Sequence, residues 1–240
     1  MEMVIANKKI GIMQPYFFPY IGYWQLLNAV DEYIIFDDVN YIKSGWINRN
    51  NILYNRAVKR INLYIRDASQ NRLIKDTHLA ENNNTEKLIR LIKDAYRKAP
   101  YFNETFNLLE RLLRCNNDNL SDFLKYQIEA ICEYLEITTK IYLSSNLEKN
   151  RSLKGEEKII DICINRGADC YINAIGGKEL YHKEIFERYG IKLLFLRNIC
   201  SSYKQFENLF VPDLSIIDVM MFNSVEEIQQ LLTEFKLENA

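Results

Sequence analysis

The first hydrophobic runs of the chain alternate with a segment of helical spacing. Residues Lys9–Met13 form a short apolar run that stops at Gln14-Pro15, and Tyr33–Phe36 form a second run that stops at Asp37-Asp38. Between them, Ile21–Val30 carries apolar residues at the spacing of an amphipathic helix. Strand, proline-containing loop, helix and strand in this order predict a βαβ unit and therefore a parallel sheet.

The middle of the chain has helical periodicity. An alternating stretch at Arg60–Arg66 predicts a half-exposed strand. Three apolar stripes then predict helices at Thr85–Tyr96, Phe102–Leu113 and Leu120–Leu135. We expect an α-rich segment at about 85–136, either inserted into the sheet or lying as a layer over it.

From Lys140 onward the strand and helix patterns alternate again. Short apolar runs predict strands at Ile141–Leu143, Asp169–Ala174 and Ile191–Leu196. Predicted helices cover Lys154–Arg166, the segment from Gly176-Gly177 to Arg188, and the tail Val225–Lys236. The pattern predicts an α/β fold with a mostly parallel, Rossmann-like sheet, a helical middle segment and a C-terminal helix. No linker divides it, so we expect residues 1–240 to form a single domain.

Composition and charge limit the classes of partner. The net charge is −1, whereas a protein that binds duplex nucleic acid needs an excess of Lys and Arg, so we expect no nucleic-acid partner. No run of about 18 apolar residues predicts a membrane span. The five cysteines are scattered and form no CxxC pair, which is typical of reduced, mostly buried thiols. These features predict a cytoplasmic protein.

Polar and aromatic residues follow both strands of the βαβ unit, where parallel sheets bind ligands. Three clusters lie there. Their purely structural alternatives are an aromatic loop for the first cluster, a helix cap or turn for the second, and a solvated turn around a buried Trp for the third. The first cluster is Gln14, Tyr16, Tyr20, Gly22 and Tyr23. The second is Asp37, Asp38 and Lys43, and the third is Trp46, Asn48, Arg49 and Asn50.

Each residue type suggests a role. One of the two aspartates is suited to act as a general base, Arg49 and Lys43 to bind an anion, and Trp46 to stack on a base or sugar. Of the two histidines, His78 is the better candidate base, although a surface histidine is the simpler interpretation of both His78 and His182. Two histidines form no His-rich metal site, and we expect neither a metal nor another cofactor.

Taken together, these motifs resemble the WbqC-like family, which is often encoded in bacterial O-antigen and other surface-polysaccharide gene clusters. The resemblance rests on QPYFFPYIGY (Gln14–Tyr23), DEYIIFDDVNYIKSGWINRN (Asp31–Asn50), KAPYF (Lys98–Phe102), SSNL (Ser144–Leu147), YINAIGGKELY (Tyr171–Tyr181) and LSIIDVMMFN (Leu214–Asn223). These matches add Ser144, Ser145, Gly176 and Gly177 to the expected substrate-binding residues.

The resemblance implies a transferase that moves an acyl or aminoacyl group, such as glycyl, to the amino group of a nucleotide-linked amino sugar. Its partners would be that sugar and an acyl or aminoacyl donor, with a carrier-protein thioester as one option. In this reading the base comes from Asp37, Asp38 or His78, and Gln14 and Asn48 supply hydrogen-bond donors. Two alternatives remain: a non-catalytic nucleotide-sugar binding protein, and an ATP-dependent ligase or nucleotidyltransferase of the HIGH type, to which the opening βαβ is similar.

Overall fold

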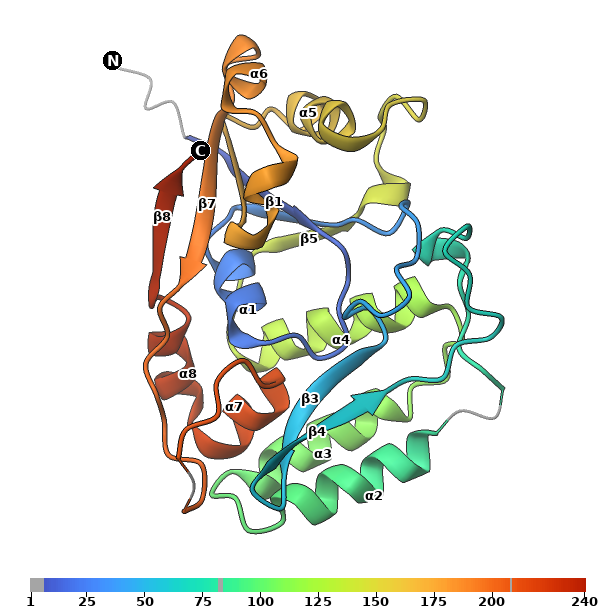
Figure 1. The fold of residues 1–240 in the computed structure, drawn as a ribbon, viewed down its shortest axis with the longest axis vertical. Coiled ribbons are helices and arrows are strands. Elements are labelled where there is room, and N and C mark those ends of the chain that lie inside the picture. The colour runs from blue at the N-terminus through green and yellow to red at the C-terminus, as the bar shows by residue number, and fades with distance from the viewer. Residues whose placement is uncertain (1–6, 82–83, 208) are drawn as a thin grey trace.

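A six-stranded, mostly parallel sheet organises the fold (Figure 1). The computed structural model describes residues 7–81, 84–207 and 209–240. Along the sheet the strands follow the order β5 (Lys140–Leu143), β2 (Glu32–Ile35), β1 (Lys9–Met13), β6 (Cys170–Ala174), β7 (Lys192–Asn198) and β8 (Phe235–Asn239). All neighbouring pairs are parallel except β7 and β8. The predicted α/β class with a mostly parallel sheet is therefore confirmed.

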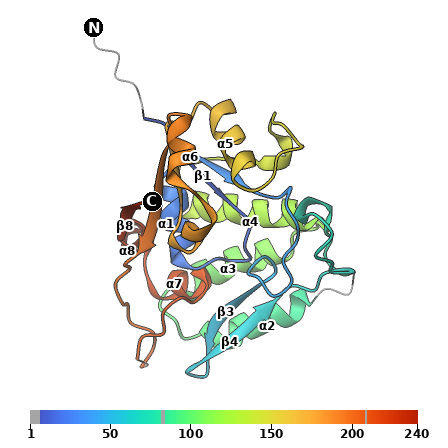
Figure 2. The same cartoon turned by 45° about the horizontal axis from the view of Figure 1, so that its top comes forward.

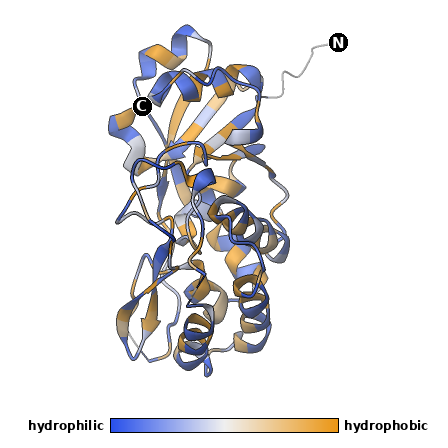
Figure 3. Ribbon diagram, turned by 90° about the vertical axis from the view of Figure 1, so that its right-hand side faces the viewer, coloured by the Kyte–Doolittle hydropathy of each residue, from blue (hydrophilic) through white to orange (hydrophobic). Residues whose placement is uncertain are grey.

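Helices cover both faces of the sheet, as a parallel sheet requires. Helices α1 (Ile21–Asn28) and α4 (Leu120–Tyr134) contribute to one hydrophobic cluster, and α5 (Gly155–Asn165) and α6 (Lys183–Arg188) contribute to the other. Side chains alternate between the clusters along each strand, so that Ile172 of β6 joins the first and Tyr171 the second. Figure 3 shows the hydrophobic strands between these layers.

The order in which strands are added to the sheet reverses beside β1. After β1 the chain adds β2 and then β5 on one side, and it later adds β6 and β7 on the other. Ligands of open α/β sheets bind outside the carboxyl ends of the strands at such a reversal. The loop after β1 leaves the sheet at this point.

The middle of the chain forms a separate layer beside the sheet (Figure 2). A hairpin of β3 (Arg49–Tyr54) and β4 (Ala57–Asn62) packs next to α2 (Thr85–Tyr96), which in turn packs on α3 (Phe102–Leu113). The strand predicted at Arg60–Arg66 therefore begins and ends earlier, because it pairs with β3. Both residues of the hairpin turn, Asn55 and Arg56, have positive φ, as a type I′ turn requires.

The C-terminal region differs most from the prediction. The prediction of one helix over Val225–Lys236 is wrong in its second half. Helix α8 (Val225–Leu231) ends early, and the following strand β8 pairs antiparallel with β7. Pairing there covers the open edge of β7, and an Arg197–Glu238 ion pair joins the two strands. A further helix, α7 (Ile216–Phe222), precedes α8.

Within the described ranges, three short 3₁₀ helices complete the fold: η1 (Ile74–Asp76), η2 (Ser144–Asn146) and η3 (Ile175–Leu180). The helix predicted from Gly176-Gly177 to Arg188 is thus divided, and His182 precedes α6 as its N-cap. Of the five cysteines, Cys132, Cys163 and Cys170 are buried. In the part of the chain that the structure describes, no helix has the length and apolar character needed to cross a membrane.

Candidate functional site

A hollow of about 370 Å³ opens beside the loop that follows β1. Its lining residues come from three segments that are distant in the sequence: Tyr16, Pro19 and Tyr20; Trp46 and Asn50; and Asp213. Aromatic rings therefore form much of its wall, and one carboxylate lies at its edge. We call this site the aromatic hollow.

Hydrogen bonds join the three segments around the aromatic hollow. The Phe17 amide donates to the Trp46 carbonyl at 3.1 Å. The side-chain amide of Asn50 donates to the carbonyls of Phe17 at 3.0 Å and Phe18 at 2.7 Å, and the Ser215 hydroxyl also donates to the Phe18 carbonyl at 2.7 Å. Because these bonds are buried, they hold the wall in one arrangement. Asn50 therefore both lines the hollow and joins β3 to the loop that follows β1.

Unusual backbone conformations lie next to the aromatic hollow. Phe18 has φ of 42° and Asp213 has φ of 57°, a region that non-glycine residues rarely adopt. Such conformations are kept only where the surrounding structure enforces them, and they are frequent at ligand sites. Asp213 is exposed and lines the hollow, and its carboxylate is close enough to Tyr20 to affect the pKa of that residue.

The tyrosines of the hollow are neutral hydrogen-bond donors. Burial raises the pKa of Tyr16, and the neighbouring Tyr20 raises it further. Burial also raises the pKa of Tyr20, with a smaller contribution from the carboxylate of Asp213. Trp46 keeps 44% of its surface exposed, so one side of its ring is free to contact a ligand.

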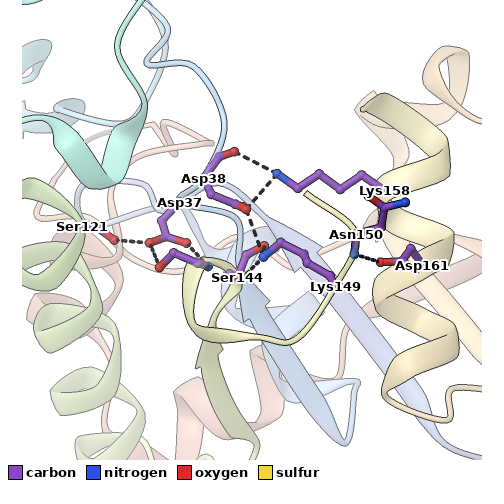
Figure 4. A network of polar contacts seen from close by, with 9 residues as sticks. Asp37, Asp38, Ser121, Ser144, Lys149, Asn150, Lys158 and Asp161 are labelled. Atoms are coloured by element: carbon purple, nitrogen blue, oxygen red, sulfur yellow. Dashed lines mark hydrogen bonds and ion pairs between the residues drawn. The ribbon is translucent and has the colours of Figure 1, made fainter. Parts of the chain in front are cut away.

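A second polar site surrounds Asp37 at the end of β2 (Figure 4). The buried Asp37 carboxylate accepts hydrogen bonds from the amide and hydroxyl of Ser145, at 2.8 and 2.6 Å, and from the hydroxyl of Ser121 at 3.2 Å. Asp37 therefore joins the end of β2 to η2 and α4. This arrangement brings together Asp37 and Ser145, as expected of neighbouring strand ends.

Asp38 lies beside it between two buried lysines. Its Oδ2 is 3.0 Å from Nζ of Lys149 and 2.9 Å from Nζ of Lys158, whose side chains are 1% and 9% exposed. Lys149 also donates to the carbonyl and hydroxyl of Ser144, and Lys158 donates to the Asp38 carbonyl. Burial opposes ionisation of Asp38, but the hydrogen bonds, that from Lys158 first, outweigh it and lower its pKa.

A known protein family matches most of the chain. Residues 14–230 match the WbqC-like protein family. The chain belongs to the WbqC-like protein family. It is also similar to "Uncharacterized protein Rv1507c" of Mycobacterium tuberculosis, with 27% identity over 219 residues, which cover 90% of this chain and 94% of that relative. No solved structure shows significant similarity.

Other residues predicted from the first WbqC-like motif lie under or beside the aromatic hollow. Tyr23 is buried, its hydroxyl donates to the Gln14 carbonyl at 3.3 Å, and its ring packs against Tyr16 with centroids 5.5 Å apart. Tyr23 therefore supports a wall residue. Gly22 lies directly beneath the Tyr20 ring, so this ring occupies the space that a side chain at position 22 would need.

Several predicted residues lie outside both sites. The Asn48 amide contacts the Tyr41 hydroxyl and the Leu63 carbonyl, and Arg49 donates to the Gly45 carbonyl. Lys43 is exposed in the preceding loop. His78 contacts Asp118, at 3.3 Å, and Gly176 and Gly177 lie in η3 after β6. The roles proposed for these residues stay predictions.

The sequence did not reveal four residues of these sites. Asp213 and Ser121 lie outside the three clusters that the sequence singled out, and Lys149 and Lys158 lie in or near a helix where lysines are ordinarily exposed. One signal was available: Lys158 lies four residues before Ile162, so the two share the apolar side of the predicted helix. A charged residue on an apolar side indicates a buried ion pair.

We expect Gly22→Ala to destabilise the protein by about 1–3 kcal/mol through overpacking. A Cβ at this position would lie 2.5 Å from Cε2 of Tyr20, which forces the ring out of place. The matched control is Gly176→Ala, whose Cβ would meet nothing within 4 Å and which should change stability little. Urea unfolding of both variants checks this result, and equal stability of the two would contradict it.

Proposed function

We propose that this WbqC-like protein is a transferase of bacterial surface-polysaccharide biosynthesis. It moves an acyl or aminoacyl group, such as glycyl, from an activated donor to the amino group of a nucleotide-linked amino sugar. The observation that carries the proposal is the aromatic hollow, where Tyr16, Tyr20 and Trp46 surround a space next to the Asp213 carboxylate. Aromatic faces suit the C–H surfaces of a sugar ring, and a carboxylate suits its ammonium group.

The chemistry follows from these groups. Asp213 pairs with the ammonium of the sugar and accepts a proton from it, which frees the nitrogen lone pair. The nitrogen attacks the carbonyl carbon of the donor, and the hydroxyls of Tyr16 and Tyr20 donate to the developing oxyanion. The new C–N bond forms as the bond from carbonyl carbon to the leaving group breaks, and the leaving group departs with a proton.

In this proposal Asp37 and Asp38 have a structural role and do not act as the base. Asp38 is paired with two ammonium groups and its pKa is lowered, which makes its carboxylate a weak base. Asp37 has its carboxylate occupied by two serines. Both aspartates hold the strand ends from which the neighbouring loops depart.

A mass measurement tests the proposal. The protein is incubated with nucleotide-linked 4-amino sugars and with glycyl or acyl thioesters, and the sugar is analysed for the mass of one added acyl group. We expect a gain for an amino sugar and none for the matching hydroxy sugar. If the folded protein binds the amino sugar but never adds mass with any donor, the non-catalytic interpretation replaces this one.

We expect Trp46→Ala to raise KM for the amino sugar about tenfold, the equivalent of ~1.4 kcal/mol, with a smaller change in kcat. The ring contributes binding surface that is used equally in the ground and transition states. Steady-state kinetics separates the two constants. The control is Tyr64→Ala, an aromatic residue of similar exposure at 43% that does not line the aromatic hollow.

A further inference from the structure

Basic residues are concentrated on one part of the surface. Residues 55–60 of the hairpin and 87–98 of α2 and its C-terminal neighbours hold eight of the 31 basic residues and one of the 32 acidic residues. All eight are exposed: Arg56, Lys59, Arg60, Lys87, Arg90, Lys93, Arg97 and Lys98. In a chain of net charge −1 this basic face, as we call it, creates a strong local positive potential.

The described residues of the basic face have few acidic partners. Among the residues that the structure describes, none of the eight forms an ion pair. The neighbouring Glu86 is occupied by Arg114 of the following helix. The hairpin and α2 lie side by side in Figures 1 and 2, and the Leu53 amide donates to the Tyr96 hydroxyl at 2.9 Å. The hairpin and α2 are therefore in direct contact.

A hollow of about 430 Å³ lies in the basic face. Arg56, Arg97 and Lys98 contribute its positive charge, and its apolar lining comes from Leu53, Ala95 and Phe206. Two carboxylates, those of Asp94 and Glu207, also line it. Carboxylates repel a phosphate backbone but can pair with the mixed charges of a protein, so this lining favours an acidic protein over a nucleic acid.

This hollow and the aromatic hollow border the same two segments. Strand β3 contributes Asn50 to the aromatic hollow and Leu53 to the basic one, and three residues of a strand span about 10 Å. The connection between β7 and α7 contributes Phe206 to the basic hollow and Asp213 to the aromatic one. A partner on the basic face therefore lies within reach of a flexible arm from the proposed acceptor site.

We propose that the basic face is the docking surface for an acidic carrier protein that presents the acyl donor as a thioester on a flexible arm. The proposal rests on the proposed function and names its second substrate. The sugar nitrogen attacks the thioester carbonyl, the C–N bond forms and the C–S bond breaks. The sulfur stays on the carrier as a thiol, which takes up the second proton that the nitrogen loses, the first having passed to Asp213.

The test measures binding and transfer separately, with the full chain. The probe is the acidic acyl carrier protein of the organism that makes this chain, in its free-thiol and acyl-loaded forms, and binding is followed by calorimetry at several salt concentrations. The variant is Arg56→Glu with Arg97→Glu and Lys98→Glu. The matched control is Arg188→Glu with Lys192→Glu, two exposed basic residues on α6 and β7.

We expect the triple variant to bind the carrier at least tenfold more weakly and with a smaller salt dependence, while the control binds normally. Transfer from the loaded carrier should fall in proportion, whereas transfer from a small soluble thioester should not change. Absence of carrier binding by the unmodified protein, equal binding by the variant, or binding of duplex RNA in place of the carrier would overturn the proposal. Binding is measured without turnover, so a failure of the proposed transfer reaction leaves this result interpretable.

Discussion

Replacement of Asp213 by Asn should lower kcat/KM of the proposed transfer by about 10²–10⁴-fold. The substitution removes the carboxylate that accepts the ammonium proton but keeps the size and shape of the side chain. Asn also tolerates the positive φ of 57° at this position, so folding should be preserved. The loss should appear in kcat as well as KM, because the proton is transferred in the reaction.

The matched control for this prediction is Asp67→Asn. Asp67 is also an exposed aspartate with positive φ, at 48°, but it does not line the aromatic hollow. We expect its variant to keep full activity. If both variants were equally active, the base would lie elsewhere, and Asp37, Asp38 and His78 would be tested next in the same way.

Asp38→Asn should produce the largest loss of stability, about 3–5 kcal/mol in the free energy of unfolding. The substitution leaves the ammonium groups of Lys149 and Lys158 buried next to each other without their shared counter-charge. Urea unfolding at pH 7 measures the loss. A second replacement, Lys158→Met, removes one of the two charges and should restore part of the stability in a double-mutant cycle.

An exposed ion pair provides the control. Lys75 and Asp76 are 2.8 Å apart with side chains 38% and 53% exposed, so Asp76→Asn should cost less than ~1 kcal/mol. A loss at Asp38 as small as that at Asp76 would mean that water reaches the site.

The pH dependence of stability gives an independent check on Asp38. Its pKa is lower in the folded than in the unfolded protein. Its contribution is therefore fully present above its unfolded pKa of 3.8 and is lost as the pH falls through the lower folded value. Asp38→Asn should flatten the decline of the unfolding free energy in this acidic range, and an unchanged slope there would contradict the assignment.

The sheet could be predicted because its signals are local. Each of the first elements is predicted by the spacing of its own apolar residues. This holds for the runs Lys9–Met13 and Tyr33–Phe36 and for the helix between them. Local spacing gives the wrong element at the tail, where Leu231, Leu232 and Phe235 fit a helix but the residues that follow α8 pair with the open edge of β7. A tertiary contact there outweighs the local preference.

The hairpin and the sites were harder to predict because they depend on contacts between residues that are distant in the sequence or lack a strong local signal. Asn55-Arg56 lacks the glycine that usually marks a type I′ turn, so the pairing of β3 with β4 has no strong sequence signal. Asp213 reaches the aromatic hollow because Ser215 bonds to Phe18 and Asn51, two residues far away in the sequence. No local pattern encodes contacts of this kind, whereas Tyr16, Tyr20 and Trp46 belong to recognisable motifs.

The central claim is that the aromatic hollow accepts the amino sugar, and a crystal structure of the protein with a bound nucleotide-linked 4-amino sugar tests it most directly. We expect the amino nitrogen within hydrogen-bond distance of the Asp213 carboxylate and the sugar ring against Trp46. A sugar bound elsewhere, such as beside Gly176 and Gly177 at the end of β6, with the aromatic hollow empty, would contradict it.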